Sequence, residues 1–110
     1  MIKAFALLKR AEGMSLEEFR AWWLGPHAEL AKRLPGLLEY RISIRTGDPN
    51  DNPFIPGEPP FDGIAEIWFE SREALLAAWK RTAEGDQAVA DSLAHTSLRV
   101  NLVTEEYRIV

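Results

Sequence analysis

One titratable ring and two tryptophans lie close together in the segment EEFRAWWLGPHAELAKRLPG, Glu17–Gly36. His27 follows Trp23 by four residues, so helical spacing would turn the two rings toward the same side. An imidazole, with an ordinary pKa of about 6.5, takes up and returns a proton near neutral pH, which suits general acid–base catalysis. His27 is therefore the candidate catalytic residue.

A structural role is the alternative for His27, because a lone inward histidine commonly bonds backbone carbonyls. Gly25-Pro26 favours the functional role, since Pro26 leaves a carbonyl in the preceding turn without its usual partner. We expect His27 to line an enclosed cavity between the first helix and the sheet, with at least one of Trp22 and Trp23 in its wall. Burial would lower the pKa of the imidazole, whereas a carboxylate such as Asp62 or Glu66 would raise it.

Four aromatic residues are candidates for the walls of a substrate site, since such sites are mostly apolar: Trp22, Trp23, Tyr40 and Trp68. Plain core packing is the alternative for each. Asp62 is a candidate catalytic residue that would orient the imidazole or bind a substrate hydroxyl, although an Asp-Gly pair is also common turn chemistry. His95 is expected to be structural, near the C-terminal end of a helix where a cation is favoured.

Hydrophobic periodicity predicts the elements that position these residues. Alternating apolar residues predict four strands, at 2–9, 38–45, 62–69 and 98–109. An S-x-x-E capping pattern at Ser15 begins a helix, which Pro35-Gly36 ends. Ser71 caps a second helical region, which we expect to be interrupted near Gly85.

Right-handed crossovers convert this βαββαβ order into a ferredoxin-like α+β fold, a four-stranded antiparallel sheet with both helices on one face. The other face would carry Glu39, Arg41, Ser43 and Arg45, together with apolar residues of the first and third strands. Monomers seldom expose such an apolar patch, so we expect a homodimer formed through the sheet faces. A solvated face is the alternative.

The segment Thr46–Pro60 holds five of the seven prolines, so it predicts a long loop rather than a helix or a paired strand. Long loops inside small domains are usually lids or disordered segments. We expect this one to be mobile, or to fold over a pocket mouth or the partner subunit.

The composition bounds the class of protein. A chain of 110 residues predicts a single domain, residues 1–110, and no apolar run approaches the roughly 20 residues of a membrane span. The net charge of −4, with dispersed basic residues, argues against nucleic acid. The absence of cysteine excludes disulfides and thiolate catalysis and fits a cytoplasmic location. Two distant histidines predict no metal site, and the expected partner is a small apolar ligand.

The chain resembles the EthD family of the dimeric α+β barrel superfamily. The family pattern F-r-x-[YW]-W-x-x-x-H-x-x-x-x-x-x-L-P-G is matched by Phe19, Arg20, Trp22, Trp23, His27, Leu34, Pro35 and Gly36. The segment FDGIAEIWFES, Phe61–Ser71, is similar to the family's third strand. The resemblance implies a ferredoxin-like protomer, two sheets paired into a barrel, and an enclosed pocket between sheet and helices.

The resemblance implies chemistry only broadly. EthD is associated with an oxidative ether-degradation system, and relatives act as dehydratases, cyclases or lactone isomerases. We therefore expect a cofactor-independent acid–base enzyme for a small apolar carbonyl or aromatic compound, acting by dehydration, isomerisation or an accessory step of oxidative degradation. Two alternatives are a non-catalytic binding or accessory protein for a hydrophobic metabolite, and a haem-binding relative with His27 as axial ligand.

Overall fold

The computed structural model of this chain describes residues 1–48, 51, 54 and 56–110. Four strands form one sheet in the order β2-β3-β1-β4, and every neighbouring pair is antiparallel. The strands are β1 (Ile2–Arg10), β2 (Glu39–Ile44), β3 (Gly63–Phe69) and β4 (Thr96–Thr104). β3 and β1 are the two central strands, and both faces of β1 are largely apolar. The predicted four-stranded antiparallel sheet is confirmed.

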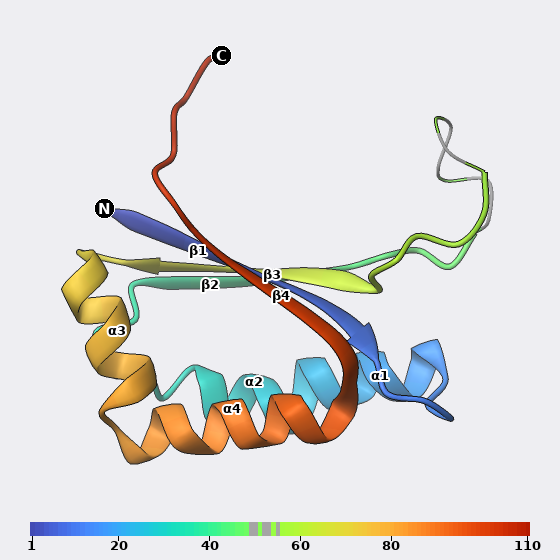
Figure 1. The fold of residues 1–110 in the computed structure, drawn as a ribbon, viewed down its shortest axis with the longest axis horizontal. Helices are drawn as coiled ribbons and strands as arrows, with labels where there is room; N and C mark the ends of the chain where they lie inside the picture. Colours follow the sequence, from blue (N-terminus) through green and yellow to red (C-terminus); the bar gives the residue numbers. More distant parts are fainter. Residues whose placement is uncertain (49–50, 52–53, 55) are drawn as a thin grey trace.

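All helical segments lie on one side of the sheet (Figure 1). They are α1 (Leu16–Trp22), the π-helical turn η1 (Trp23–His27), α2 (Ala28–Ala31), α3 (Arg72–Lys80) and α4 (Ala83–His95). The two predicted helical regions are thus present, but each is divided. The first contains a π turn, and the second consists of two helices joined by a sharp corner.

The first helix begins where the capping pattern predicts. The Ser15 hydroxyl accepts a hydrogen bond from the Glu18 backbone N–H, and the Glu18 carboxylate accepts one from the Ser15 N–H, both at 3.0 Å. Two of the free N–H groups at this helix end are therefore satisfied.

The Gly25-Pro26 pair widens the helix instead of ending it. Pro26 has no N–H to donate, so the regular i to i−4 ladder cannot continue through it. The Ala28 N–H instead reaches the carbonyls of Trp23 and Gly25, and one wider π turn carries the chain into α2. Both Trp23 and His27 point inward from this turn and are buried.

The predicted interruption of the second helical region is present, but it comes at residues 81–82, a few residues before Gly85. Thr82 caps α4, with its hydroxyl accepting from the Gly85 N–H at 2.9 Å, and Gly85 lies inside the helix. A Cβ on Gly85 would lie 2.4 Å from the Ala78 carbonyl oxygen and 2.5 Å from that of Trp79. Glycine therefore serves close packing of α4 against the end of α3 rather than a helix stop.

The last strand ends earlier than predicted. β4 stops at Thr104, not at Ile109, because it lies at the edge of the sheet and Thr104 already pairs with Lys3, near the start of β1. Residues 105–110 leave the sheet on the side away from the helices (Figure 1). In the segment Thr46–Pro60, the described residues form neither helix nor strand, as predicted. The mobility predicted for this segment concerns in part residues 49–50, 52–53 and 55, which lie outside the described residues.

The two faces of the sheet differ in what they contact. The helix-facing side packs onto α1 and η1 through its buried apolar residues Ala4, Ala6, Leu8, Ala65, Ile67 and Phe69. The opposite side carries Glu39, Arg41 and Ser43 of β2, as predicted. It also carries apolar residues of the other three strands: Phe5, Leu7, Ile64, Leu98, Val100 and Leu102.

Candidate active site

His27 is held by a carboxylate that comes from the other helical layer. Its Nδ1 lies 2.9 Å from the Asp91 Oδ2 on α4, and the Trp22 Nε1 donates to the same oxygen at 3.1 Å. An ionised carboxylate only accepts hydrogen bonds, so Nδ1 carries the proton in this pair. The neutral ring then presents Nε2 as its unprotonated nitrogen.

The Trp22 ring lies between the two histidines of the chain. Its centroid is 4.7 Å from that of His27 and 4.6 Å from that of His95, with which it stacks at 17°. The His95 Nδ1 is 2.7 Å from the backbone oxygen of Asp91, one turn earlier in α4. His95 thus closes the last turn of the helix and supports the tryptophan.

Burial is the main influence on the titration of His27. The side chain is nearly enclosed, and desolvation of the imidazolium lowers its pKa below the ordinary value. The hydrogen bond and charge of Asp91 raise the pKa of His27, while the charges of Arg99 and His95 lower it further. His27 is therefore a neutral base at pH 7.

A small cavity of about 30 Å³ lies beside this pair, and its lining includes His27, Trp23, Tyr40, Ser92 and Arg99. That is about the space of one water molecule. Burial raises the pKa of Tyr40 to about 12, so its hydroxyl remains a donor at neutral pH. The fully buried Trp23 Nε1 lies near this hydroxyl, but it forms no hydrogen bond within the part of the chain that is described.

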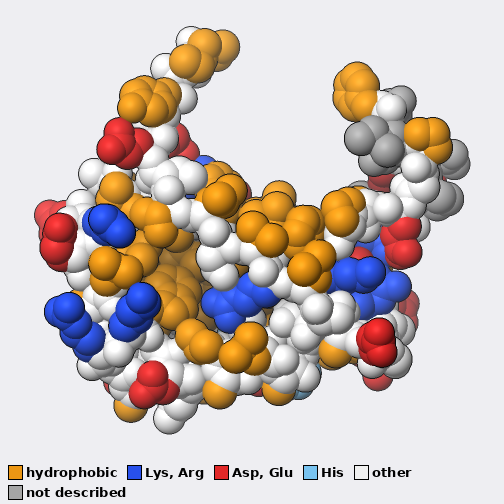
Figure 2. Space-filling view, in the orientation of Figure 1, with side chains coloured by type: hydrophobic (Ala, Val, Ile, Leu, Met, Phe, Trp, Pro, Cys, Tyr) orange, Lys and Arg blue, Asp and Glu red, His pale blue; other side chains and the backbone are white. Residues whose placement is uncertain are grey.

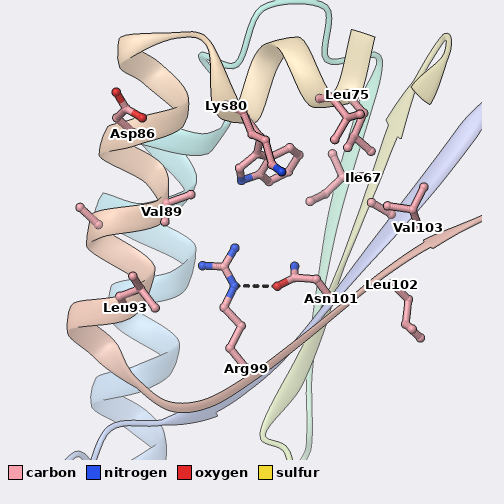
Figure 3. Close-up of a pocket in the computed structure, with 14 residues that line it drawn as sticks. Ile67, Leu75, Lys80, Asp86, Val89, Leu93, Arg99, Asn101, Leu102 and Val103 are labelled. Carbon is pink, nitrogen blue, oxygen red and sulfur yellow. Dashed lines mark hydrogen bonds between the residues drawn. The ribbon is translucent and has the colours of Figure 1, made fainter. Parts of the chain in front are cut away.

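A larger groove of about 650 Å³ begins where the small cavity ends. Ile67, Trp79 and Arg99 line both spaces. The groove lies between α3 and α4 on one side and the strands on the other, with an apolar floor and basic side chains near its mouth (Figures 2 and 3). Its size is within the range of about 300–1,000 Å³ for small-molecule sites.

Two predicted site residues lie elsewhere. Trp68 is on the opposite face of the sheet, where the Lys3 ammonium lies 4.7 Å from its ring centroid and the Arg41 guanidinium 5.4 Å. Its strand position explains this, because Ile67 and Phe69 take the helix-facing side. Trp68 therefore lines neither the small cavity nor the groove.

Asp62 likewise does not orient the imidazole. Its buried carboxylate accepts from the Arg10 backbone N–H at 2.8 Å, the Arg10 guanidinium at 2.7 Å and Arg45 Nε at 2.9 Å. Burial opposes its ionisation, but these bonds outweigh that cost and hold the pKa of Asp62 below its usual value. Glu66, the other carboxylate considered, pairs with Lys3 on the far face.

The sequence reading missed the two charged residues that face His27. Asp91 lies after the interruption expected near Gly85, and the sequence pattern assigned no helix face to that part of the chain. The spacing of Ala88, Asp91, Ser92 and His95 on one helix face would have indicated its position. Arg99 lies in the predicted strand 98–109, but its alternation with Leu98 and Val100 does not show that the arginine faces inward.

Other ligand classes find little support in the described residues. Nowhere among them do three or more histidine and carboxylate side chains form a potential metal site. The cavity of about 30 Å³ at His27 is too small for a haem, so the residues present do not fit that group. Across the described ranges, no helix has the length and apolarity needed to cross a membrane.

Comparison with known proteins gave both sequence and fold matches. A model of the EthD domain matches residues 11–95. A crystal structure of an ethyl tert-butyl ether D (EthD) family protein from Bacillus halodurans is 27% identical, with a TM-score of 0.79. The match covers 97% of this chain and 99% of that one. No functionally curated protein matches the sequence.

More distant structures share the fold alone. A dimeric ferredoxin-like protein of unknown function from Thermobifida fusca is 14% identical, with a TM-score of 0.70 over 94% of this chain and 88% of that one. SnoaB from Streptomyces nogalater, described as a cofactor-independent oxygenase, is 9% identical. Its TM-score is 0.69, over 99% of this chain and 95% of that one.

Proposed function

This chain belongs to the EthD family, and on that basis we propose that it is a cofactor-independent acid–base enzyme for small apolar carbonyl or aromatic compounds. One observation carries the proposal, namely that a buried histidine held by a carboxylate lies at the inner end of an apolar groove. Proton transfer of this kind covers the dehydration and isomerisation steps expected from the sequence, and an accessory step in oxidative degradation.

His27 acts as the base through Nε2. Asp91 fixes the Nδ1–H tautomer and stabilises the imidazolium that forms when Nε2 takes a proton from the carbon next to a carbonyl. Returning that proton to another carbon gives isomerisation, and giving it to a departing hydroxyl gives dehydration. Because burial lowers the pKa of His27, the base is free at neutral pH.

The substrate carbonyl meets two donors at the small cavity. Tyr40 keeps its phenolic proton, since burial raises its pKa to about 12. Trp23 Nε1 is buried and unbonded in the described part of the chain, so an oxygen placed there would satisfy it. Tyr40 and Trp23 keep their predicted roles as substrate-binding residues, whereas Trp22 supports Asp91 from outside the cavity.

A binding protein is the second candidate, and the small size of the inner cavity favours it. About 30 Å³ admits little more than one water, so a ligand could fill the outer groove without bringing a reacting carbon to His27. In that case the groove would hold a hydrophobic metabolite with no turnover.

Hydrogen–deuterium exchange of 2-tetralone, an aromatic ketone with acidic α-hydrogens, separates these two functions. We expect the protein in D₂O to accelerate exchange, and His27→Gln to lower the rate by about 100-fold or more, because general-base catalysis supplies that much. Asp91→Asn should also slow exchange. Glu29→Gln, which changes an exposed carboxylate paired with Lys32, should not.

The affinity of each protein for 2-tetralone is measured together with its rate of hydrogen–deuterium exchange. Unchanged affinity with lost exchange in His27→Gln supports the enzyme. Binding to the unmodified protein with exchange no faster than in buffer would establish a binding protein instead. An undiminished rate in His27→Gln would remove the histidine from the mechanism.

We also propose that two copies pair through their sheet faces. Relatives with this fold include one described as dimeric. Apolar side chains lie on the sheet between the two segments that project from it, residues 105–110 and the described part of the β2–β3 connection (Figures 1 and 2). Tyr107 and Ile109 on the first of these segments are exposed and would be covered by a second copy.

A further inference from the structure

Arg99 occupies an unusual place on the edge strand. It pairs in register with Leu8, a buried residue on the helix-facing side of β1, so its side chain enters the groove rather than solvent. Figure 3 shows the guanidinium pointing into the space between α4 and the strands, beside Asn101. A strand residue in this position would ordinarily be apolar and pack against the helices.

Among the described residues, the Arg99 guanidinium has no acidic partner. Its Nε donates to the Asn101 side-chain oxygen at 3.0 Å, and no carboxylate pairs with it in the described residues. Asp86, the one carboxylate among the lining residues of the groove, is on the first turn of α4 and is exposed. A partly buried cation bonded only to a neutral amide is poorly compensated for the loss of water.

The rest of the groove is suited to an apolar body. Its lining includes Leu75, Trp79, Val89, Leu93 and Val103, and the guanidinium lies where the groove meets the cavity beside His27. A ligand filling the groove would therefore place a polar end against Arg99 and, next to it, an atom near the imidazole.

From these observations, and resting on the proposed function, we infer that the substrate is an amphiphilic anion. Its apolar body lies in the groove, and its carboxylate binds Arg99. Arginine suits this role, because its planar fork bonds both oxygens of a carboxylate. Arg99 is thus a specificity residue for the same site at which His27 moves the proton.

Binding of the anion would also change the pKa of His27. The groups that face His27 are Asp91 and His95 from α4, Arg99 from β4 and Tyr40 from β2. Among them, Arg99 lowers the pKa of His27 through its charge. A carboxylate on the guanidinium would offset that charge, so the pKa of His27 should rise when the ligand is bound.

Paired probes of equal shape test this inference. We expect 2-naphthoate to bind at least about tenfold more tightly than 2-naphthamide in calorimetry, because a hydrogen-bonded charge pair supplies that difference. Arg99→Gln should abolish the preference and leave naphthamide affinity unchanged, and Arg99→Lys should restore part of it. Arg41→Gln removes an arginine from the opposite face and should change neither affinity.

A second readout separates electrostatics from packing. NMR titration of the His27 ring should show a higher pKa with 2-naphthoate than with 2-naphthamide, and Arg99→Gln should remove the difference. Equal affinities for the two probes, absent binding of both, or a naphthoate preference that survives Arg99→Gln would overturn the inference. Those results leave the proton-transfer proposal standing, since that rests on 2-tetralone exchange by His27.

Discussion

At the residue scale, the burial of His27 links catalysis to folding. The side chain is 7% exposed, and desolvation lowers the pKa of the imidazole in the folded chain, against the opposing effect of Asp91. In the unfolded chain His27 takes its proton at about pH 6.5. The unfolded state therefore binds more protons just below that pH, and acid weakens the fold.

His27→Gln should make stability less sensitive to acid. The free energy of unfolding of the unmodified protein should fall as pH decreases from about 6.5 toward the lowered pKa of His27, because only the unfolded state protonates there. The variant lacks this loss. Urea titrations between roughly pH 5 and 7 measure both slopes, and parallel curves would show that His27 does not resist protonation when folded.

At the element scale, the start of a helix can be predicted from residues close together in the sequence, whereas helix packing depends on residues that are far apart in it. The start of α1 could be predicted because Ser15 and Glu18 bond each other locally. The role of Gly85 could not, because the reason for glycine there is the close approach of α3. Asp91 was missed for the same reason, since its partners Trp22 and His27 belong to another helix.

The same substitution should have opposite effects at two glycines. Gly85→Ala should destabilise the protein by about 1–3 kcal/mol, because the new Cβ would overlap backbone oxygens of Ala78 and Trp79. Gly25→Ala should stabilise it by about 0.5–1 kcal/mol, because nothing lies within 4 Å of a Cβ there and alanine favours helices. Chemical denaturation gives both values, and equal effects would refute the packing explanation.

At the scale of the whole molecule, successive side chains of each strand point to opposite faces of the sheet, and this decides which side chains lie on the face proposed to meet a second copy. The charged face of β2 could be predicted from period two, and so could an antiparallel sheet. Trp68 was assigned to the pocket on its aromatic character alone, although its neighbours Ile67 and Phe69 lie on the buried side. Side-chain chemistry thus misled where strand periodicity would have placed the ring correctly.

Two leucines of nearly equal exposure test the dimer. Leu102, 52% exposed, lies on the bare sheet face, and Leu24, 53% exposed, lies on η1. We expect the unmodified protein to sediment as a dimer. Leu102→Glu should sediment as a monomer, because the new charge would be buried at the interface. Leu24→Glu should remain a dimer. A monomeric unmodified protein, or a dimeric Leu102→Glu, would contradict pairing through the sheets.

The π turn at Trp23–His27 makes chain length in this segment matter as much as residue type. It holds one residue more than an α-helical turn, as if a single residue had been inserted. While Pro26 remains, a regular α ladder cannot form in place of this turn. Removing one residue, such as Leu24, would then rotate all that follows by about 100°. A relative shorter by one residue here would keep the histidine in an alignment, yet direct it away from Asp91.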